Sequence, residues 1–160
     1  MKVNLDEKAK LLLKTKKMEE LNKYLGYNIY IEGEVLHGLE NGRKINFPTI
    51  NQEIEGISLP DGVYISRTII DNKIYKSMTN VGTHPTISEL NKPIIETHLI
   101  NFSEMIYGKI VKVELLKFIR EQKKFASLND LMAQLEKDLV EASKYEWMLF
   151  VNYSIENITY

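Results

Sequence analysis

The sequence contains no cysteine, and this absence excludes disulfide bonds, thiolate nucleophiles and zinc sites built from cysteine. The absence also fits a reducing compartment. The first residues lack the apolar core of a signal peptide, and no stretch approaches the ~20 apolar residues of a membrane-spanning helix. We therefore expect a cytoplasmic protein with no membrane partner.

The net charge is also close to zero, because the sequence has 21 basic and 22 acidic side chains. No general field therefore draws the molecule to nucleic acid or to an anionic membrane. Lysines outnumber acidic residues between Met1 and Tyr24. This pattern leaves open a basic binding arm, although a solvated helix face is the commoner meaning, and we do not expect nucleic-acid binding.

The common phosphate-binding motifs are missing: the sequence has neither Gly-x-x-x-x-Gly-Lys-Ser/Thr nor Gly-x-Gly-x-x-Gly. A protein of this sequence that binds a nucleotide must do so by another arrangement. Repeats, low-complexity segments and flexible linkers are also absent. The 160 residues, 44% hydrophobic and 27% charged, match an ordinary globular domain with one core.

Hydrophobic spacing predicts helices near the two ends of the chain and strands between them. Residues 5–25 have helical spacing in two pieces, and Gly26 is placed to end the second. Strands are expected at residues 28–35, 63–70, 73–81, 94–100 and 109–119, the last with Val111, Val113, Leu115 and Ile119 inward. Ser127 opens a helix with an apolar stripe of Leu128, Leu131, Leu135, Leu139 and Ala142. About five or six strands favour an antiparallel barrel or sandwich.

One stretch, residues 42–51, mixes residue types that packing alone does not explain. Pro48 fixes its own φ and biases Phe47 to an extended conformation, so Thr49 and Asn51 project from a restrained backbone. An isolated Pro-Thr-x-Asn is more often a turn. A hydroxyl and a carboxamide presented in this way also suit a phosphate chain.

A second polar pair, Glu96 and His98, shares one face of a strand, because side chains two apart lie ~6.6 Å from each other on the same side. Such a pair is commonly a solvated surface couple, but its apolar neighbours also allow a partly exposed cleft. We interpret His98 as structural. His37 and His84 show no metal-ligand spacing, so no metal cage built from protein alone is assigned.

A series of short motifs follows in chain order. The motifs are Gly33-x-Val35-x-x-Gly38-x-x-x-Gly42-Arg43, Phe47-Pro48-Thr49-Ile50-Asn51, Gly62-Val63-Tyr64, Asn80-Val81-Gly82 with Pro85-Thr86, Glu96-Thr97-His98, Tyr107-Gly108-Lys109, Arg120 and Lys124-Phe125. Taken together, they resemble the ATP-dependent riboflavin kinases, including the C-terminal kinase domain of bacterial bifunctional riboflavin kinase/FMN adenylyltransferases. The resemblance runs from about Tyr24 to Tyr145. Asn46 and Ile50 depart from the glycine and alanine usual in the family.

The resemblance implies a mainly β fold with flanking helices: a six-stranded antiparallel Greek-key (split) barrel with a covering C-terminal helix. It also implies transfer of the γ-phosphoryl group of ATP to the 5′-hydroxyl of riboflavin, which gives FMN and ADP. Thr49 would bind a divalent metal, expected to be Mg²⁺ brought with ATP, and Asn51 would help to hold the same group.

The remaining roles also follow from the resemblance. The loop with Gly38, Gly42 and Arg43 would close over the nucleotide. Glu96 would be the general base that takes the proton from the flavin's hydroxyl, and Arg120 would line the flavin side.

Three regions are expected along the chain. Residues 1–26 resemble an interdomain linker with helical character, residues 27–146 form the barrel domain with its C-terminal helix, and residues 147–160 form an apolar tail. A missing FMN adenylyltransferase domain is a candidate partner. The alternative function is a non-catalytic flavin-binding or regulatory module that uses the lysine-rich N-terminus on RNA.

Overall fold

The computed structural model of the chain describes residues 4–36, 49–82, 93–100, 102 and 104–145. Six strands form one antiparallel sheet in the order β1-β6-β3-β4-β5-β2. They are β1 (Tyr30–Glu34), β2 (Thr49–Glu53), β3 (Gly62–Ile70), β4 (Lys73–Gly82), β5 (Ile94–Leu99) and β6 (Ile110–Arg120). The helices among the described residues are α1 (Glu7–Lys14), α2 (Met18–Leu25) and α4 (Leu128–Ser143).

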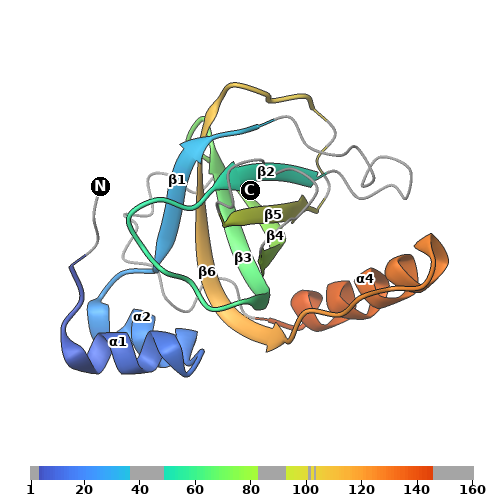
Figure 1. Cartoon of the computed structure of the whole chain (residues 1–160). Helices are drawn as coiled ribbons and strands as arrows, with labels where there is room; N and C mark the ends of the chain where they lie inside the picture. Colours follow the sequence, from blue (N-terminus) through green and yellow to red (C-terminus); the bar gives the residue numbers. More distant parts are fainter. Residues whose placement is uncertain (1–3, 37–48, 83–92, 101, 103, 146–160) are drawn as a thin grey trace.

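The sheet curls into a nearly closed barrel whose edge strands β1 and β2 approach each other (Figure 1). Backbone N–H of Leu36 donates to the carbonyl oxygen of Asn51 at 2.8 Å. The Gln52 side chain closes the same seam from inside, because its Nε2 donates to the carbonyl oxygens of Gly33 at 2.9 Å and Val111 at 2.8 Å. The predicted six-stranded antiparallel barrel is thereby confirmed.

Apolar residues of the strands and of the two N-terminal helices form one core cluster in the barrel, beside a buried network of hydroxyl side chains from Ser66, Ser77, Thr79 and Thr97. The predicted inward residues Val111, Val113 and Leu115 are fully buried. Leu13 and Leu21 belong to the same core cluster. The Asn22 side chain secures this packing by donating to the carbonyl oxygen of Leu115 at 2.8 Å. The helices α1 and α2 thus cap one end of the barrel (Figure 1).

Helix α4 covers the outside of the sheet with most of its predicted apolar stripe. Leu135 and Ala142 form a second buried cluster with residues of β3, β4 and β6. Two details of the prediction were wrong. Leu128 is 48% exposed, and Ile119 packs against this second cluster instead of the barrel interior, because register shifts in the pairing of β3 with β6 interrupt the alternation.

The end of α2, the turn between β3 and β4 and the start of α4 lie at the residues that the sequence predicted for them. Gly26 ends α2 in the left-handed conformation with φ 79°. Asp71 and Asn72 both have positive φ, 50° and 65°, which is the two-residue turn that matches the twist of a hairpin. Ser127 caps α4 by accepting a hydrogen bond from the backbone N–H of Asp130 at 3.2 Å. The hairpin and the helix start are confirmed.

Candidate functional site

A single row of directly opposed residues crosses five strands of the sheet. Asn51 of β2 lies opposite Glu96 of β5, and Glu96 lies opposite Asn80 of β4. The row continues to Val63 of β3 and then to Arg120 of β6. Directly opposed residues in antiparallel strands point to the same face. The strand order therefore brings three of the predicted site residues, Asn51, Glu96 and Arg120, onto one line.

This row lies on the outer face of the barrel. The residues next to its members, Ile50, Ile95 and Val81, are buried in the interior cluster, so the row itself faces the other way. Met78 lies two residues before Asn80 on β4, on the same face, and packs in the outer cluster beneath α4. The predicted residues Asn51 and Glu96 therefore lie on the outer face of β2 and β5, on the same face as the cluster beneath α4.

Thr49 belongs to this face too, because it lies two residues before Asn51 on the same strand. Its Oγ1 is 2.9 Å from Nδ1 of His98, the residue directly opposite on β5. The ring of His98 thus fixes the position of the Thr49 hydroxyl. The structural interpretation of His98 agrees with this contact.

The side chain of Asn51 is 5% exposed, and its Oδ1 has no hydrogen-bond partner among the described residues. Oε1 of the neighbouring Gln52 shares this property but lies on the inner face, whereas Asn51 lies on the face of Glu96. A buried acceptor without a partner costs about 1–3 kcal/mol, and binding an ion is one way in which it gains a partner. Amide and hydroxyl oxygens are ligands that Mg²⁺ accepts, usually together with water and phosphate oxygens. Thr49 and Asn51 therefore fit a divalent ion that arrives with a phosphate chain.

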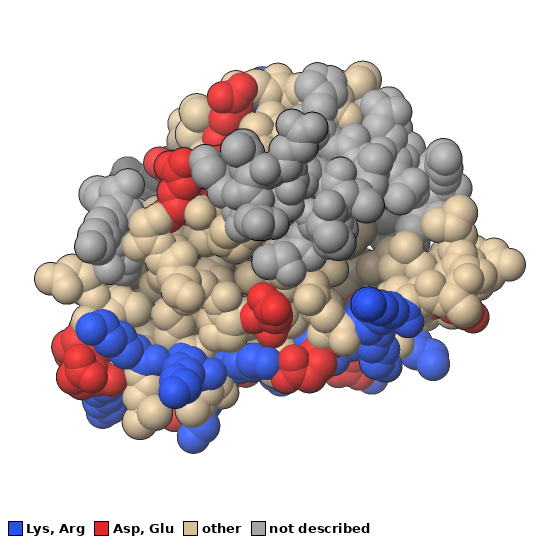
Figure 2. All heavy atoms as spheres, viewed as in Figure 1, with Lys and Arg blue, Asp and Glu red and all other residues tan. Residues whose placement is uncertain are grey.

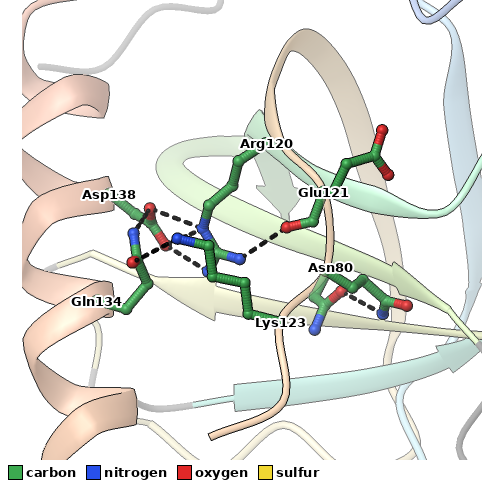
Figure 3. A network of polar contacts seen from close by, with 7 residues as sticks. Asn80, Arg120, Glu121, Lys123, Gln134 and Asp138 are labelled. Carbon is green, nitrogen blue, oxygen red and sulfur yellow. Dashed lines mark hydrogen bonds and ion pairs between the residues drawn. The ribbon is translucent and has the colours of Figure 1, made fainter.

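Arg120 is engaged by the protein itself (Figure 3). Its Nε lies 3.0 Å and its Nη2 2.8 Å from carboxylate oxygens of Asp138 on α4. Its Nη1 donates to the carbonyl oxygen of Glu121 at 3.0 Å. The edge of the guanidinium with Nε and Nη2 thus ties the end of β6 to α4, while Nη1 holds the backbone of the next residue. The flavin-lining role of Arg120 stays a prediction.

Asn80 belongs to the Asn80-Val81-Gly82 motif, and no site role was predicted for it. Its Oδ1 accepts a hydrogen bond from Nε2 of Gln122 at 2.7 Å. The signal that could have found it is the pairing of its strand with the strand of Glu96. The predicted nucleotide loop residues Gly38, Gly42 and Arg43 lie outside the described residues, as does the tail from 147 to 160.

Charges of both signs alternate over the N-terminal helices (Figure 2). Lys16 pairs with Glu121 at 2.5 Å, and Glu19 lies 3.8 Å from Lys117. Lys16 and Lys117 therefore stand beside acidic groups, as on a solvated surface. Across the part of the chain that the structure describes, no helix is long and apolar enough to span a membrane.

Comparisons with known proteins point to one family. The model of the Flavokinase family, described as riboflavin kinase, matches residues 25–146. A bifunctional riboflavin kinase/FMN adenylyltransferase of Bacillus subtilis is 37% identical over 132 residues, which are 80% of this chain and 42% of that protein. The chain thus spans less than half the length of this relative.

Solved structures show the same fold. A crystal structure from Streptococcus pneumoniae, described as a macrolide-efflux protein, superimposes with a TM-score of 0.79 at 28% identity, over 88% of this chain and 47% of that one. A riboflavin kinase from Trypanosoma brucei gives a TM-score of 0.51 at 20% identity, over 79% and 84% of the two chains. Since the family model matches most of the chain, this protein belongs to the riboflavin kinase family.

Proposed function

We propose that the chain is an ATP-dependent riboflavin kinase, which transfers the γ-phosphoryl group of ATP to the 5′-hydroxyl of riboflavin and releases FMN and ADP. The observation that carries the proposal is the direct opposition of Asn51 and Glu96 on one face of the sheet. Oxygen ligands for a phosphate-bound ion thereby lie beside a carboxylate that can accept a proton. Family membership supports the same reaction.

Glu96 is the proposed general base. Its carboxylate takes the proton of the 5′-hydroxyl as that oxygen forms a bond to the γ-phosphorus. The bond between the γ-phosphorus and the oxygen bridging to the β-phosphate breaks, and its electron pair leaves with ADP. Base catalysis of this kind typically contributes about 10²- to 10⁴-fold to the rate.

Thr49 and Asn51 are the proposed holders of a divalent ion, Mg²⁺ in our proposal, with His98 keeping the Thr49 hydroxyl in place. When bound, such an ion neutralises the charge on the phosphate oxygens and aligns them for transfer. Gly38, Gly42 and Arg43 are proposed to contact the nucleotide from the preceding loop. Together these residues form the ATP side of the site.

The flavin is proposed to bind on the opposite side of Glu96. The row supports this assignment, because Asn80 and then Arg120 follow Glu96 in the direction away from Asn51. The proposed location of the enzyme is the cytoplasm. Its proposed partner, by analogy with the bifunctional Bacillus subtilis relative, is an FMN adenylyltransferase domain that would consume the FMN.

The test is conversion of riboflavin to FMN by purified protein with ATP and Mg²⁺, followed by chromatography. We expect FMN to accumulate and to stop on addition of EDTA. A non-catalytic flavin-binding module would instead quench riboflavin fluorescence without forming FMN and without needing the metal. That outcome would overturn the proposal.

A further inference from the structure

Asn80 is the neighbour of the proposed base on the side away from the proposed ion ligands. Directly opposed residues of antiparallel strands have Cβ atoms about 4.5–5.5 Å apart, so the side chains of Asn80 and Glu96 share one small surface. Asn80 is only partly buried. A molecule whose hydroxyl reaches Glu96 therefore passes within reach of the Asn80 amide.

The Asn80 amide is held in place by Gln122, whose Nε2 donates to Asn80 Oδ1 at 2.7 Å. Gly82 makes room for this contact. A Cβ at position 82 would lie 2.1 Å from Nε2 of Gln122, which is closer than real Cβ atoms come to other groups. A side chain at this position would displace the Gln122 amide from Asn80.

The segment that carries Gln122 contacts α4 both before and after that residue (Figure 3). Before it, Arg120 is bound to Asp138 of α4. After it, Nζ of Lys123 lies 3.3 Å from Oε1 of Gln134 on the same helix. Gln134 in turn donates to Asp138 at 2.9 Å. Helix α4 thus sets the position of Gln122, and Gln122 sets that of the Asn80 amide.

We propose that Asn80 is a further substrate-positioning residue, whose amide binds a hydroxyl of the flavin's polyol side chain next to the reacting one. Gln122 is the positioning residue that orients it. An amide can donate to or accept from a hydroxyl, and it is uncharged, so it suits a polyol better than a phosphate. The inference rests on the riboflavin kinase activity proposed above and names a contact on its flavin side.

Steady-state kinetics with riboflavin and ATP varied separately test this role. Asn80→Ala is expected to lower kcat/KM for riboflavin about tenfold, the size of one lost hydrogen bond, with KM for ATP within about twofold of wild type. Gln122→Ala is expected to give a smaller loss. The double variant is expected to be no worse than Asn80→Ala, because Gln122 acts through Asn80.

Gln122→Glu is expected to lose as much activity as Gln122→Ala, because a carboxylate cannot donate to Asn80 Oδ1 in the orientation that the structure shows. The matched control lies one residue earlier in the chain. Glu121→Gln, in the same segment, is expected to match wild type, because the Glu121 side chain points to Lys16. Should Asn80→Ala fail to fold, Asn80→Ser takes its place.

A substrate change tests the contact without any mutation. A riboflavin analogue that lacks the 4′-hydroxyl is expected to react about tenfold less efficiently with wild type, and Asn80→Ala is expected to show no further loss. Equal losses toward ATP and riboflavin, additive effects of the two alanine variants, or an analogue that reacts as well as riboflavin would overturn the inference. Absence of FMN with the wild type would instead overturn the proposed activity on which the inference depends.

Discussion

At the scale of single residues, Asn51 is the most informative position. Its neighbour Gln52 is also buried, but Gln52 uses its Nε2 to close the barrel seam, whereas Asn51 faces the outer surface beside Glu96. Oδ1 of Asn51, like Oε1 of Gln52, has no hydrogen-bond partner among the described residues. If Asn51 Oδ1 serves as the proposed ion ligand, this position should show a conflict between stability and activity.

Asn51→Leu is therefore expected to leave the free energy of unfolding unchanged or to raise it by about 1 kcal/mol, because an apolar group of similar size replaces an amide whose Oδ1 has no partner among the described residues. The same change is expected to abolish FMN formation, because the proposed ligand oxygen is lost. Urea unfolding and the FMN assay measure the two effects. A variant that keeps wild-type activity would contradict the role of Asn51.

Gln52→Leu is the matched control, one residue away and equally buried. It is expected to destabilise the protein, because it removes the hydrogen bonds to Gly33 and Val111, while activity per folded molecule stays near that of wild type. If both variants gained stability, the distinction between the two amides would be wrong.

At the scale of elements, α4 is attached to the barrel by an apolar stripe and by the ion pair of Arg120 with Asp138. The side chain of Asp138 is 3% exposed and that of Arg120 is 15% exposed, so solvent screens this pair little. Removing one partner of such a pair leaves the other charge buried without a partner. The position of α4 therefore depends on both residues.

Asp138→Ala is expected to lower the free energy of unfolding by about 3 kcal/mol, since Arg120 would be left largely buried without its carboxylate. Replacing the pair together, with Arg120→Met and Asp138→Leu, is expected to restore much of that loss. Urea unfolding of the three proteins measures both values. A double variant less stable than Asp138→Ala would show that the pair contributes net stability, contrary to this expectation.

The first turn of α1 should respond to pH through its N-cap, Asp6. The hydroxyl of Tyr24, at 2.6 Å, and then the backbone N–H of Ala9, at 2.8 Å, lower the pKa of the Asp6 carboxyl from its ordinary value of 3.8. A lowered pKa means that the ionised cap stabilises the fold above pH 3.8 and that this contribution is lost as pH falls through the folded-state pKa.

Asp6→Ala is therefore expected to melt at a lower temperature than wild type at pH 7, and the two melting temperatures should converge as pH falls below about 4. Glu7→Ala, in the same turn, is the control. The Glu7 side chain is 95% exposed, so its removal should change the melting temperature little at either pH. A difference for Asp6→Ala that persists unchanged at pH 3 would contradict the assignment of the cap.

Strand periodicity and turn residues predicted most elements, including the hairpin at Asp71 and Asn72 and the start of α4 at Ser127. Strand β2 was not predicted as a strand, because Asn51 and Gln52 are polar residues that the fold buries, and this hides its apolar pattern. Ile119 was misplaced because a register shift is not visible in the sequence. Both failures come from tertiary pairing, which local patterns do not encode.

At the scale of the whole molecule, the site depends on long-range pairing. The motifs indicated Asn51, Glu96 and Arg120 through resemblance, but their alignment in one row follows from the strand order β2-β5-β4-β3-β6. That order joins segments far apart in the chain. Asn80 and Gln122 entered the site only through this pairing and through the contact between them.

The N-terminal helices share the buried core cluster of the barrel. Met18 and Leu21 are at most 1% exposed, and each buried side chain of this size contributes about 1.5–3 kcal/mol. A chain that begins at residue 27 is therefore expected to lose several kcal/mol, comparable with the whole stability of a domain, and to lack a cooperative thermal transition. Circular dichroism checks this against the full chain. A sharp transition within a few degrees of the full chain would mean that residues 1–26 act as a separable linker.

Phosphoryl transfer to riboflavin is proposed to use Glu96 as the base. The most direct measurement is the rate of FMN formation by wild type and by Glu96→Gln, with ATP affinity measured on both proteins. We predict FMN from the wild type, a rate lower by about 10²- to 10⁴-fold in Glu96→Gln, and ATP affinity within about twofold. No FMN from the wild type would contradict the proposed riboflavin kinase activity. Equal rates from the two proteins would contradict the role of Glu96 as the base.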